Sequence, residues 1–155
     1  MSDYYLDASA LVKRYVNEVG STWVRQLTDP HPGDTVLLAE ITLAEAAAAI
    51  AAKQRISGGI TLEQRDRALS LFLQNCDTYF LLLPVDRAVL DRAVELTQDH
   101  RLRGYDAVQL ACALVASDVM NANGLPPLTF VASDGNLLTA AAAEGLPVDD
   151  PLSHP

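Results

Sequence analysis

The sequence predicts one α/β domain in which helices cover both faces of a parallel sheet, a doubly wound architecture. Short, continuously apolar segments alternate along the chain with longer segments of helical spacing. This alternation is the pattern of a parallel sheet buried on both faces. The chain has 155 residues, the usual size of one domain, and half of them are hydrophobic. That apolar content is enough to bury a core and excludes a disordered chain.

The chain begins with one strand and two helices. The apolar segment Tyr4–Leu6 predicts the first strand. Helical spacing over Ala10–Glu18 stops at Gly20, and Ser21–Leu27 predicts a second helix. The run of breakers at residues 29–33 then ends this part of the chain.

The middle of the chain continues with a strand and two helices. Thr35–Leu38 predicts the second strand, and the alanine-rich segment Thr42–Arg55 predicts a helix that ends before Gly58. Thr61 and Gln64 have the spacing of a capping box, so we expect Thr61 to be the N-cap of a long helix that reaches about residue 77.

The rest of the chain repeats the alternation. We expect three more strands, each a short apolar segment: Phe80–Leu83, Leu128–Ala132 and Leu146–Val148. We expect three more helices, each with apolar residues at helical spacing: Asp86–Gln98, Tyr105–Met120 and Asn136–Glu144. The sequence therefore predicts five strands and about seven helices.

The charge of the chain is strongly negative. The chain has eleven Lys and Arg residues and 20 Asp and Glu residues, which gives a formal net charge of −9. No Lys or Arg follows Arg103. This balance excludes a module that binds nucleic acid through a broad basic surface.

Cysteine content and the N-terminus favour a cytoplasmic protein. Cys76 and Cys112 are isolated in apolar segments, so we expect two buried free thiols and no disulfide framework. The first residues show no signal-peptide pattern. The longest apolar run, Ala46–Ala52, is far too short to span a membrane.

Acidic residues follow two of the expected strands. Asp7 and Ser9 come directly after the first strand, and Asp134 follows the strand Leu128–Ala132. Because the carboxyl ends of parallel strands meet at one edge of a sheet, we expect these side chains to lie close together. Each residue is also a common helix N-cap when it is considered singly.

Two more acids lie on expected helices. Glu45 has almost only apolar neighbours, and a carboxylate in such a place needs a partner. Asp106 follows Gly104 and could instead be a helix N-cap. If both converge with Asp7 and Asp134, their mutual repulsion requires a cation or raised pKa values. Ligands that are all oxygen atoms favour Mg²⁺ or Mn²⁺, which commonly serve phosphate chemistry.

Other phosphate-handling α/β folds do not match these residues. Ser9 breaks the Asp-x-Asp pattern of haloacid dehalogenase-type phosphatases, and Leu11 breaks the Asp-x-Ser-x-Ser pattern of adhesion modules. A receiver domain needs a late Lys, but none follows Lys53. No P-loop or GxGxxG pattern is present either.

The four acids in their order and spacing resemble the acidic quartet of PIN-domain ribonucleases. The resemblance rests on these segments: Asp7-x-Ser9, Glu45, Asp106-Ala-Val-Gln-Leu-Ala and Phe-Val-Ala-Ser-Asp134. The segment from Lys13 to Ser21 also resembles the first helices of VapC-type toxins of toxin–antitoxin pairs.

The resemblance implies a five-stranded sheet of order 3-2-1-4-5 within a domain at residues 1–148, followed by a short tail at residues 149–155. It implies that Asp7, Asp106 and Asp134 ligate Mg²⁺ or Mn²⁺, that Glu45 is a ligand or positions the attacking water, and that Ser9 hydrogen-bonds a carboxylate or a metal-bound water. It also implies a homodimer that is inhibited by a small antitoxin protein.

We therefore expect a metal-dependent endoribonuclease with an RNA substrate. The alternative is a non-catalytic module of the same fold that binds a protein partner through its acidic groove. RNA contacts require local positive charge, and we expect Arg101, Arg103, Lys53 and Arg55 at the rim of the site. Each of them is also compatible with an ordinary solvated helix end.

Overall fold

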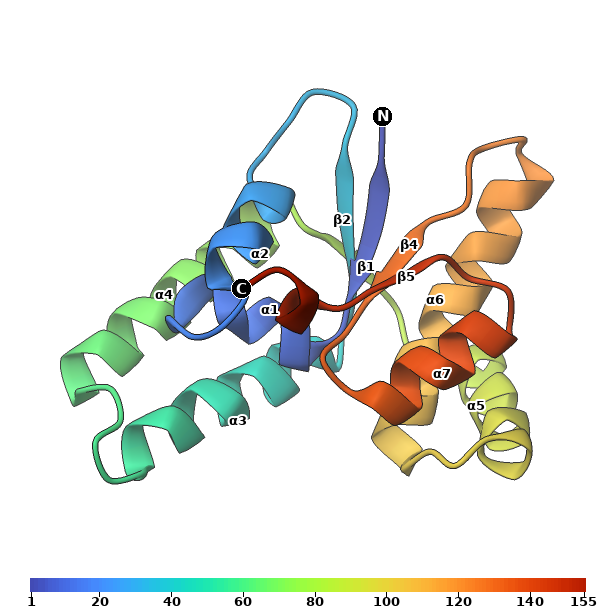
Figure 1. The fold of residues 1–155 in the computed structure, drawn as a ribbon. Coiled ribbons are helices and arrows are strands. Elements are labelled where there is room, and N and C mark those ends of the chain that lie inside the picture. The colour runs from blue at the N-terminus through green and yellow to red at the C-terminus, as the bar shows by residue number, and fades with distance from the viewer.

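A computed structural model describes residues 1–155 and confirms the predicted architecture (Figure 1). Five parallel strands form one sheet in the order β3-β2-β1-β4-β5. The strands are β1 Asp3–Leu6, β2 Thr35–Ala39, β3 Leu81–Leu83, β4 Thr129–Val131 and β5 Val148–Asp149. The helices are α1 Ala8–Tyr15, α2 Ser21–Thr28, α3 Thr42–Arg55, α4 Leu62–Thr78, α5 Arg87–Asp99, α6 Gly104–Ala122 and α7 Gly135–Ala143.

All the expected strands and helices are present, and some of their ends differ for local reasons. The capping box of Thr61 and Gln64 at the start of α4 is formed as predicted. Helix α1 begins at Ala8 rather than Ala10, because the Asp7 side chain caps it by accepting the Ala10 N–H.

The last strand lies two residues later than the sequence predicts. Leu146 completes the end of α7, since its N–H donates to the carbonyl of Ala141 at 3.1 Å. Gly145 precedes it with φ of 92°, a backbone conformation that favours glycine. Strand β5 therefore begins at Val148, and Asp149 pairs with Val131.

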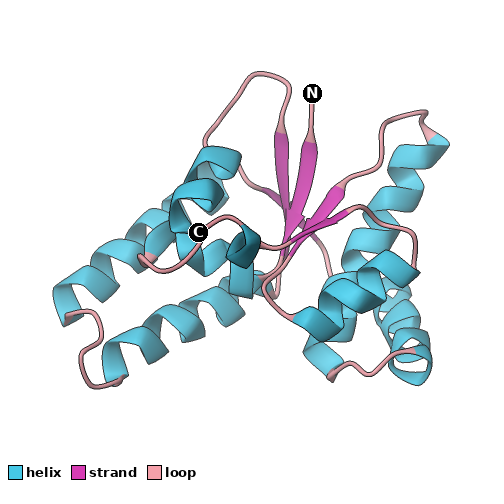
Figure 2. Cartoon of the chain, viewed as in Figure 1, coloured by secondary structure: helices cyan, strands magenta, loops and turns pink.

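Two separate cores lie on the two faces of the sheet. Adjacent residues of β1 point to opposite faces: Leu6 contributes to a core with α1, α2, α3 and α4, and Tyr5 to a core with α5, α6 and α7. The cartoon shows these two helix groups flanking the strands on either side (Figure 2). The predicted free thiols are both buried, Cys76 in the first core and Cys112 in the second.

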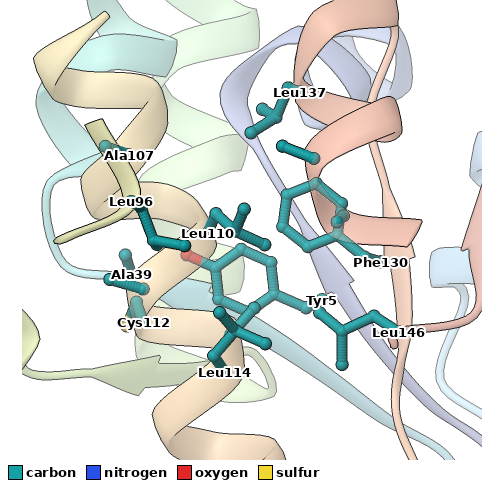
Figure 3. Packing of buried hydrophobic residues seen from close by; sticks show 14 of the residues in the cluster. Tyr5, Ala39, Leu96, Ala107, Leu110, Cys112, Leu114, Phe130, Leu137 and Leu146 are labelled. Carbon is teal, nitrogen blue, oxygen red and sulfur yellow. The ribbon is translucent and has the colours of Figure 1, made fainter. Parts of the chain in front are cut away.

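The second core is organised around an aromatic stack. The rings of Tyr5 and Phe130 are stacked with centroids 5.4 Å apart. Leu110 and Leu114 of α6 lie beside the Tyr5 ring, and the Tyr5 hydroxyl points toward the α6 side of this core (Figure 3). Tyr5 is fully buried, so its hydroxyl needs a protein partner.

The sheet brings the exits of β1 and β4 together. These strands are neighbours in the middle of the sheet, and Leu6 pairs with Val131. The Asp7 N–H then donates to the Val131 carbonyl at 3.2 Å. Strand order reverses at this point, which is the place where parallel α/β sheets bind ligands.

The residues after β5 pack against α2. Pro151 is buried in a short 3₁₀ helix, Pro151–Ser153, and the rings of Trp23 and His154 are stacked with centroids 4.2 Å apart. A side chain at Gly20 would place its Cβ 2.4 Å from the Pro151 carbonyl oxygen, so glycine permits this close approach.

No helix of the chain has the length and apolar character that a membrane crossing requires.

Candidate active site

Asp7 lies at the exit of β1 and is the most buried acid of the site. Only 6% of its surface is exposed. The Ser9 hydroxyl and the Ala10 N–H both donate to its carboxylate. Burial raises the pKa of Asp7 to about 6, although these hydrogen bonds oppose the shift. The negative charges of Glu45 and Asp106 add to the rise.

Glu45 and Asp106 lie in the first turns of α3 and α6. Burial raises the pKa of Glu45, the hydrogen bond from Gln109 opposes the rise, and the charge of Asp106 adds to it. Asp106 forms an ion pair with Arg103 at 3.2 Å. Arg103 is the residue that precedes α6, so the interpretation of Asp106 as an N-cap is wrong.

Asp134 follows β4 and caps α7 by accepting the Leu137 N–H at 3.0 Å. The residue before it connects it to the first strand, because the Ser133 N–H donates to the Ser9 hydroxyl oxygen at 3.0 Å. The N-cap interpretation is therefore correct for both Asp7 and Asp134, and both still lie at the same edge of the sheet. Capping and a role in a site are compatible.

A polar cavity of about 460 Å³ lies beside the acids between α5, α6 and α7. Asp106 and Asp134 line it together with Arg101 and Arg103. The other lining residues are Thr97, His100, Leu102 and Asn136. Asp106 thus connects the two halves of the site, since it interacts with Asp7 and Glu45 and shares this cavity with Asp134.

The four acids are partly stabilised by helix N-termini. Asp7 and Asp134 cap α1 and α7, and Glu45 and Asp106 lie in the first turns of α3 and α6. The N-terminus of a helix carries partial positive charge and favours an anion there by about 0.3–1 kcal/mol. Two carboxylates that share one cation at a separation of about 4 Å would repel by about 4 kcal/mol in surroundings of intermediate polarity, which is more than this. Helix dipoles alone would therefore not balance such a cluster.

The donor set suits a hard divalent cation. All its donors are oxygen atoms, and no positive side chain contributes to the pKa shifts of the buried Asp7 or of Glu45. The Ser133 hydroxyl oxygen is buried and has no hydrogen-bond partner. No three His, Cys, Asp or Glu side chains already surround one point as metal ligands. Asp106 pairs with Arg103, and Asp134 accepts the Leu137 N–H through Oδ1.

The predicted rim residues separate into two places. Arg101 and Arg103 lie in the acidic cavity, next to Asp106 and Asp134. Lys53 instead pairs with Glu18 near the end of α1, and Arg55 is exposed at the end of α3. Only the arginine pair before α6 is therefore placed together with the acids.

The sequence interpretation missed a role for Gln109. This side chain is 1% exposed and donates from Nε2 to Glu45 at 3.2 Å and to Thr42 at 2.9 Å. Its carbonyl oxygen accepts the Tyr5 hydroxyl at 2.6 Å. A signal was present, since Gln109 is a polar residue within the strongly apolar segment that follows Asp106.

Comparisons with known proteins point to one family. The sequence model of the PIN domain matches residues 4–120. Ribonuclease VapC45 of Mycobacterium tuberculosis (strain CDC 1551 / Oshkosh) is 34% identical to this chain over 143 residues, which is 91% of this chain and 90% of that protein.

Solved structures share the fold. The sarcin–ricin loop cleaving toxin VapC20 of Mycobacterium tuberculosis is similar with a TM-score of 0.59 and 18% identity, covering 94% of this chain and 96% of that one. A toxin–antitoxin complex from Klebsiella pneumoniae is similar with a TM-score of 0.56 and 19% identity, covering 96% and 97%. At these low sequence identities, the similarity shows a shared fold and nothing more.

Proposed function

Because the chain belongs to the PIN-domain family, we propose that it is a metal-dependent endoribonuclease and the toxin of a toxin–antitoxin pair. One observation carries the proposal. Asp7 and Asp134 lie at neighbouring strand exits, Glu45 and Asp106 lie in the first turns of α3 and α6, and Asp106 and Asp134 share a cavity with two arginines. Such an arrangement combines an oxygen-rich cation site with a place for a phosphodiester. The relative named as a ribonuclease supports the same activity.

The four acids have separate roles in this proposal. Asp7, Asp106 and Asp134 would hold Mg²⁺ or Mn²⁺, and Glu45 would be a further ligand or orient the attacking water. When bound, such an ion lowers the pKa of water and offsets charge that develops on a phosphoryl oxygen. Ser9 keeps the Asp7 carboxylate oriented, since its hydroxyl lies within hydrogen-bonding distance of both carboxylate oxygens and donates its one hydrogen to the carboxylate.

We assign Glu45 as the group that receives a proton. Its carboxylate accepts the Gln109 amide, whereas Asp7 and Asp134 cap helices and Asp106 pairs with Arg103. Burial also raises the pKa of Glu45, which favours proton uptake. In hydrolysis the water oxygen bonds to phosphorus, the bond from phosphorus to the leaving oxygen breaks, and the water proton passes to Glu45. The leaving oxygen then takes up a proton from solvent.

Arg101 and Arg103 are the groups that would hold the RNA backbone. Both line the cavity that contains Asp106 and Asp134. The chain carries a net charge of −9, so its overall field repels RNA and attraction must be local. A guanidinium binds a phosphate through two parallel hydrogen bonds.

The proposed partners are an antitoxin and a second copy of the chain. The fold neighbour described as a toxin–antitoxin complex supports the first. The net charge of −9 suits a basic antitoxin segment. An arginine-rich peptide should therefore inhibit cleavage, and less strongly as salt is raised. The homodimer is testable by sedimentation of the purified protein. Action on RNA fits the cytoplasmic location expected from the sequence.

The decisive experiment is cleavage of a mixed RNA pool by the purified chain, with Mg²⁺, with Mn²⁺ and with EDTA. We expect cleavage only with a divalent ion, and at least a hundredfold loss in Asp7→Asn. Asp118→Asn is the matched control, because Asp118 is exposed and lies only in a long 3.9 Å ion pair with Arg92. Equal cleavage by wild type and Asp7→Asn would contradict the assignment.

The alternative function has a distinct outcome in the same experiment. A non-catalytic module that binds a partner through its acidic groove would leave the RNA intact at every metal concentration. The arginine-rich peptide would still bind it and would bind Asp7→Asn more weakly. That combination would replace the ribonuclease proposal with the binding module.

A further inference from the structure

A cluster of buried polar side chains lies directly behind the acids. Gln109 is 1% exposed, and both Tyr5 and Thr42 are fully buried. The Tyr5 hydroxyl donates to the Gln109 carbonyl oxygen at 2.6 Å, and Gln109 Nε2 donates to Thr42 Oγ1 at 2.9 Å. The same nitrogen donates to Glu45 Oε1 at 3.2 Å. This is the contact through which the cluster reaches the site.

Both N–H groups and the carbonyl oxygen of the Gln109 amide are hydrogen-bonded to protein partners. Its two N–H bonds serve Thr42 and Glu45, and its oxygen serves Tyr5. An ionised carboxylate can only accept, so the amide nitrogen must face Glu45 and the oxygen must face Tyr5. The orientation of the amide is thereby determined by the chemistry of its neighbours.

The cluster connects the elements that carry three of the acids. Tyr5 lies on β1 two residues before Asp7, Gln109 lies on α6 three residues after Asp106, and Thr42 begins α3 three residues before Glu45. A single side chain therefore fixes β1, α3 and α6 relative to one another just below the acids. Buried networks of this kind specify geometry when every member is satisfied.

An apolar side chain at position 109 could not donate a hydrogen bond to Glu45. Methionine has nearly the volume of glutamine and would fill the same space without burying an amide. Only the amide offers a donor to a carboxylate that also feels the charge of Asp106. The position therefore has a chemical requirement beyond packing.

We propose that Gln109 is a positioning residue of the acidic site, whose amide holds the Glu45 carboxylate in the orientation in which it serves the metal ion and the attacking water. This proposal rests on the proposed function, since it assumes that Glu45 acts there. Partners behind a metal ligand typically change metal affinity or activity by about 10-fold to 100-fold when they are removed.

The test compares Mn²⁺ affinity and structure in Gln109→Met. Titration calorimetry of the metal-free full chain with MnCl₂ should show a Kd about 10-fold weaker than wild type or more. A crystal structure of the metal-free variant should show the Glu45 carboxylate displaced or in several rotamers. Gln109→Asn, whose shorter amide cannot span to Glu45, is the second variant if Gln109→Met does not fold.

Asn75→Leu is the matched control. Asn75 is 4% exposed and donates to the Tyr15 hydroxyl at 2.7 Å, in the core on the other face of the sheet. The variant thus removes a buried amide of the same kind away from the acids. It should lower the melting temperature and leave the Kd for Mn²⁺ unchanged within twofold.

The outcomes separate the two proposals. A Gln109→Met variant that keeps both the wild-type Kd and the wild-type Glu45 conformation would make Gln109 an ordinary core residue and overturn its positioning role. If the wild type neither binds Mn²⁺ nor cleaves RNA, the metal-dependent function fails. In that case the crystal structure of Gln109→Met still decides whether the amide orients Glu45.

Discussion

The Ser9 hydroxyl oxygen lies 2.7 Å from Oδ1 and 2.8 Å from Oδ2 of Asp7. The same oxygen accepts the N–H of Ser133 at 3.0 Å. One hydroxyl therefore joins the exits of β1 and β4, the two strands that deliver acids to the site. Burial raises the pKa of Asp7, and donation from Ser9 opposes this rise.

Replacement of Ser9 by alanine should weaken both connections. We expect Ser9→Ala to raise the pKa of Asp7 above about 6, because a hydrogen bond to its buried charge is removed. The variant should also lower the free energy of unfolding at pH 7.5 by about 1–2 kcal/mol, because the Ser133 N–H loses its acceptor as well. Urea denaturation measures the stability. Ser9→Thr retains a hydroxyl and should lie between wild type and Ser9→Ala.

Asp7 should destabilise the metal-free fold at neutral pH. Its pKa is raised from 3.8 to about 6, so the folded state binds the proton more tightly than the unfolded state. The contribution of Asp7 to the free energy of unfolding is therefore most favourable below pH of about 4, and it falls by up to about 3 kcal/mol as the pH rises through about 6. Asp7→Asn cannot ionise and remains a good N-cap. In EDTA the variant should be the more stable protein at pH 7.5, with the difference gone at pH 4.

With bound metal, wild type should instead be more stable than Asp7→Asn. Saturating Mn²⁺ should stabilise wild type and leave Asp7→Asn almost unchanged, because an ion that binds only the folded state adds its binding free energy to stability. Asp118→Asn, at an exposed acid, should follow wild type in both conditions. A wild type that is more stable than Asp7→Asn in EDTA at pH 7.5 would contradict the assigned burial cost of Asp7.

The sequence was sufficient to predict the sheet and to single out four acids as candidates, because the signals for both are local. Asp7 and Asp134 directly follow apolar strands, so a parallel sheet places both at one edge. Glu45 has apolar neighbours on both sides, and Asp106 directly precedes an apolar helical segment, so each is conspicuous in the sequence. Strand order came from the family resemblance, since short apolar strands carry no information about their neighbours.

The contacts of Gln109 and Lys53 could not be predicted from the sequence, because they depend on how distant segments pack together. The Gln109 contact with Glu45 joins residues 64 positions apart, and it depends on how α6 and α3 are placed against β1. Lys53 was expected at the rim, but α3 passes over the end of α1, where Glu18 offers a carboxylate. A charged residue at a helix end indicates solvent or a partner, and the sequence alone cannot distinguish them.

Arg101 should contribute to RNA affinity by binding a phosphate directly. We expect Arg101→Glu to weaken binding of a single-stranded RNA oligonucleotide in EDTA and to reduce the slope of log Kd against log salt by about 0.7 for each phosphate that the protein no longer neutralises. Arg103→Glu should do the same and also release Asp106, its 3.2 Å ion-pair partner. Filter binding at several salt concentrations measures both.

Arg67→Glu is the control for the arginine pair. It changes the net charge equally, but Arg67 is highly exposed on α4, pairs with Glu63 and lies outside the acidic cavity. Its salt slope should match wild type. Equal slopes for Arg67→Glu and Arg101→Glu would mean that the arginines act through net charge and not by binding phosphates directly.

Glu18 should be a structural anchor that the proposed chemistry does not need. It accepts from Lys13, whose side chain is only 7% exposed, and from Lys53 of α3. Burial opposes ionisation of Glu18, but the hydrogen bond from Lys53 and the charges of both lysines outweigh it and lower its pKa. Glu18→Gln leaves a buried lysine without its counterion and should lower the free energy of unfolding at pH 7.5 by about 2 kcal/mol.

The pH dependence of this destabilisation identifies its cause. The folded pKa of Glu18 lies below its ordinary value of 4.5, so the stabilising contribution is complete above that pH and disappears as the pH falls through the folded pKa. Wild type and Glu18→Gln should therefore converge in acid. Glu63→Gln removes an exposed pair with Arg67 and should change stability by less than about 0.5 kcal/mol at any pH. A constant difference between wild type and Glu18→Gln down to low pH would assign the destabilisation to packing and not to the ion pairs.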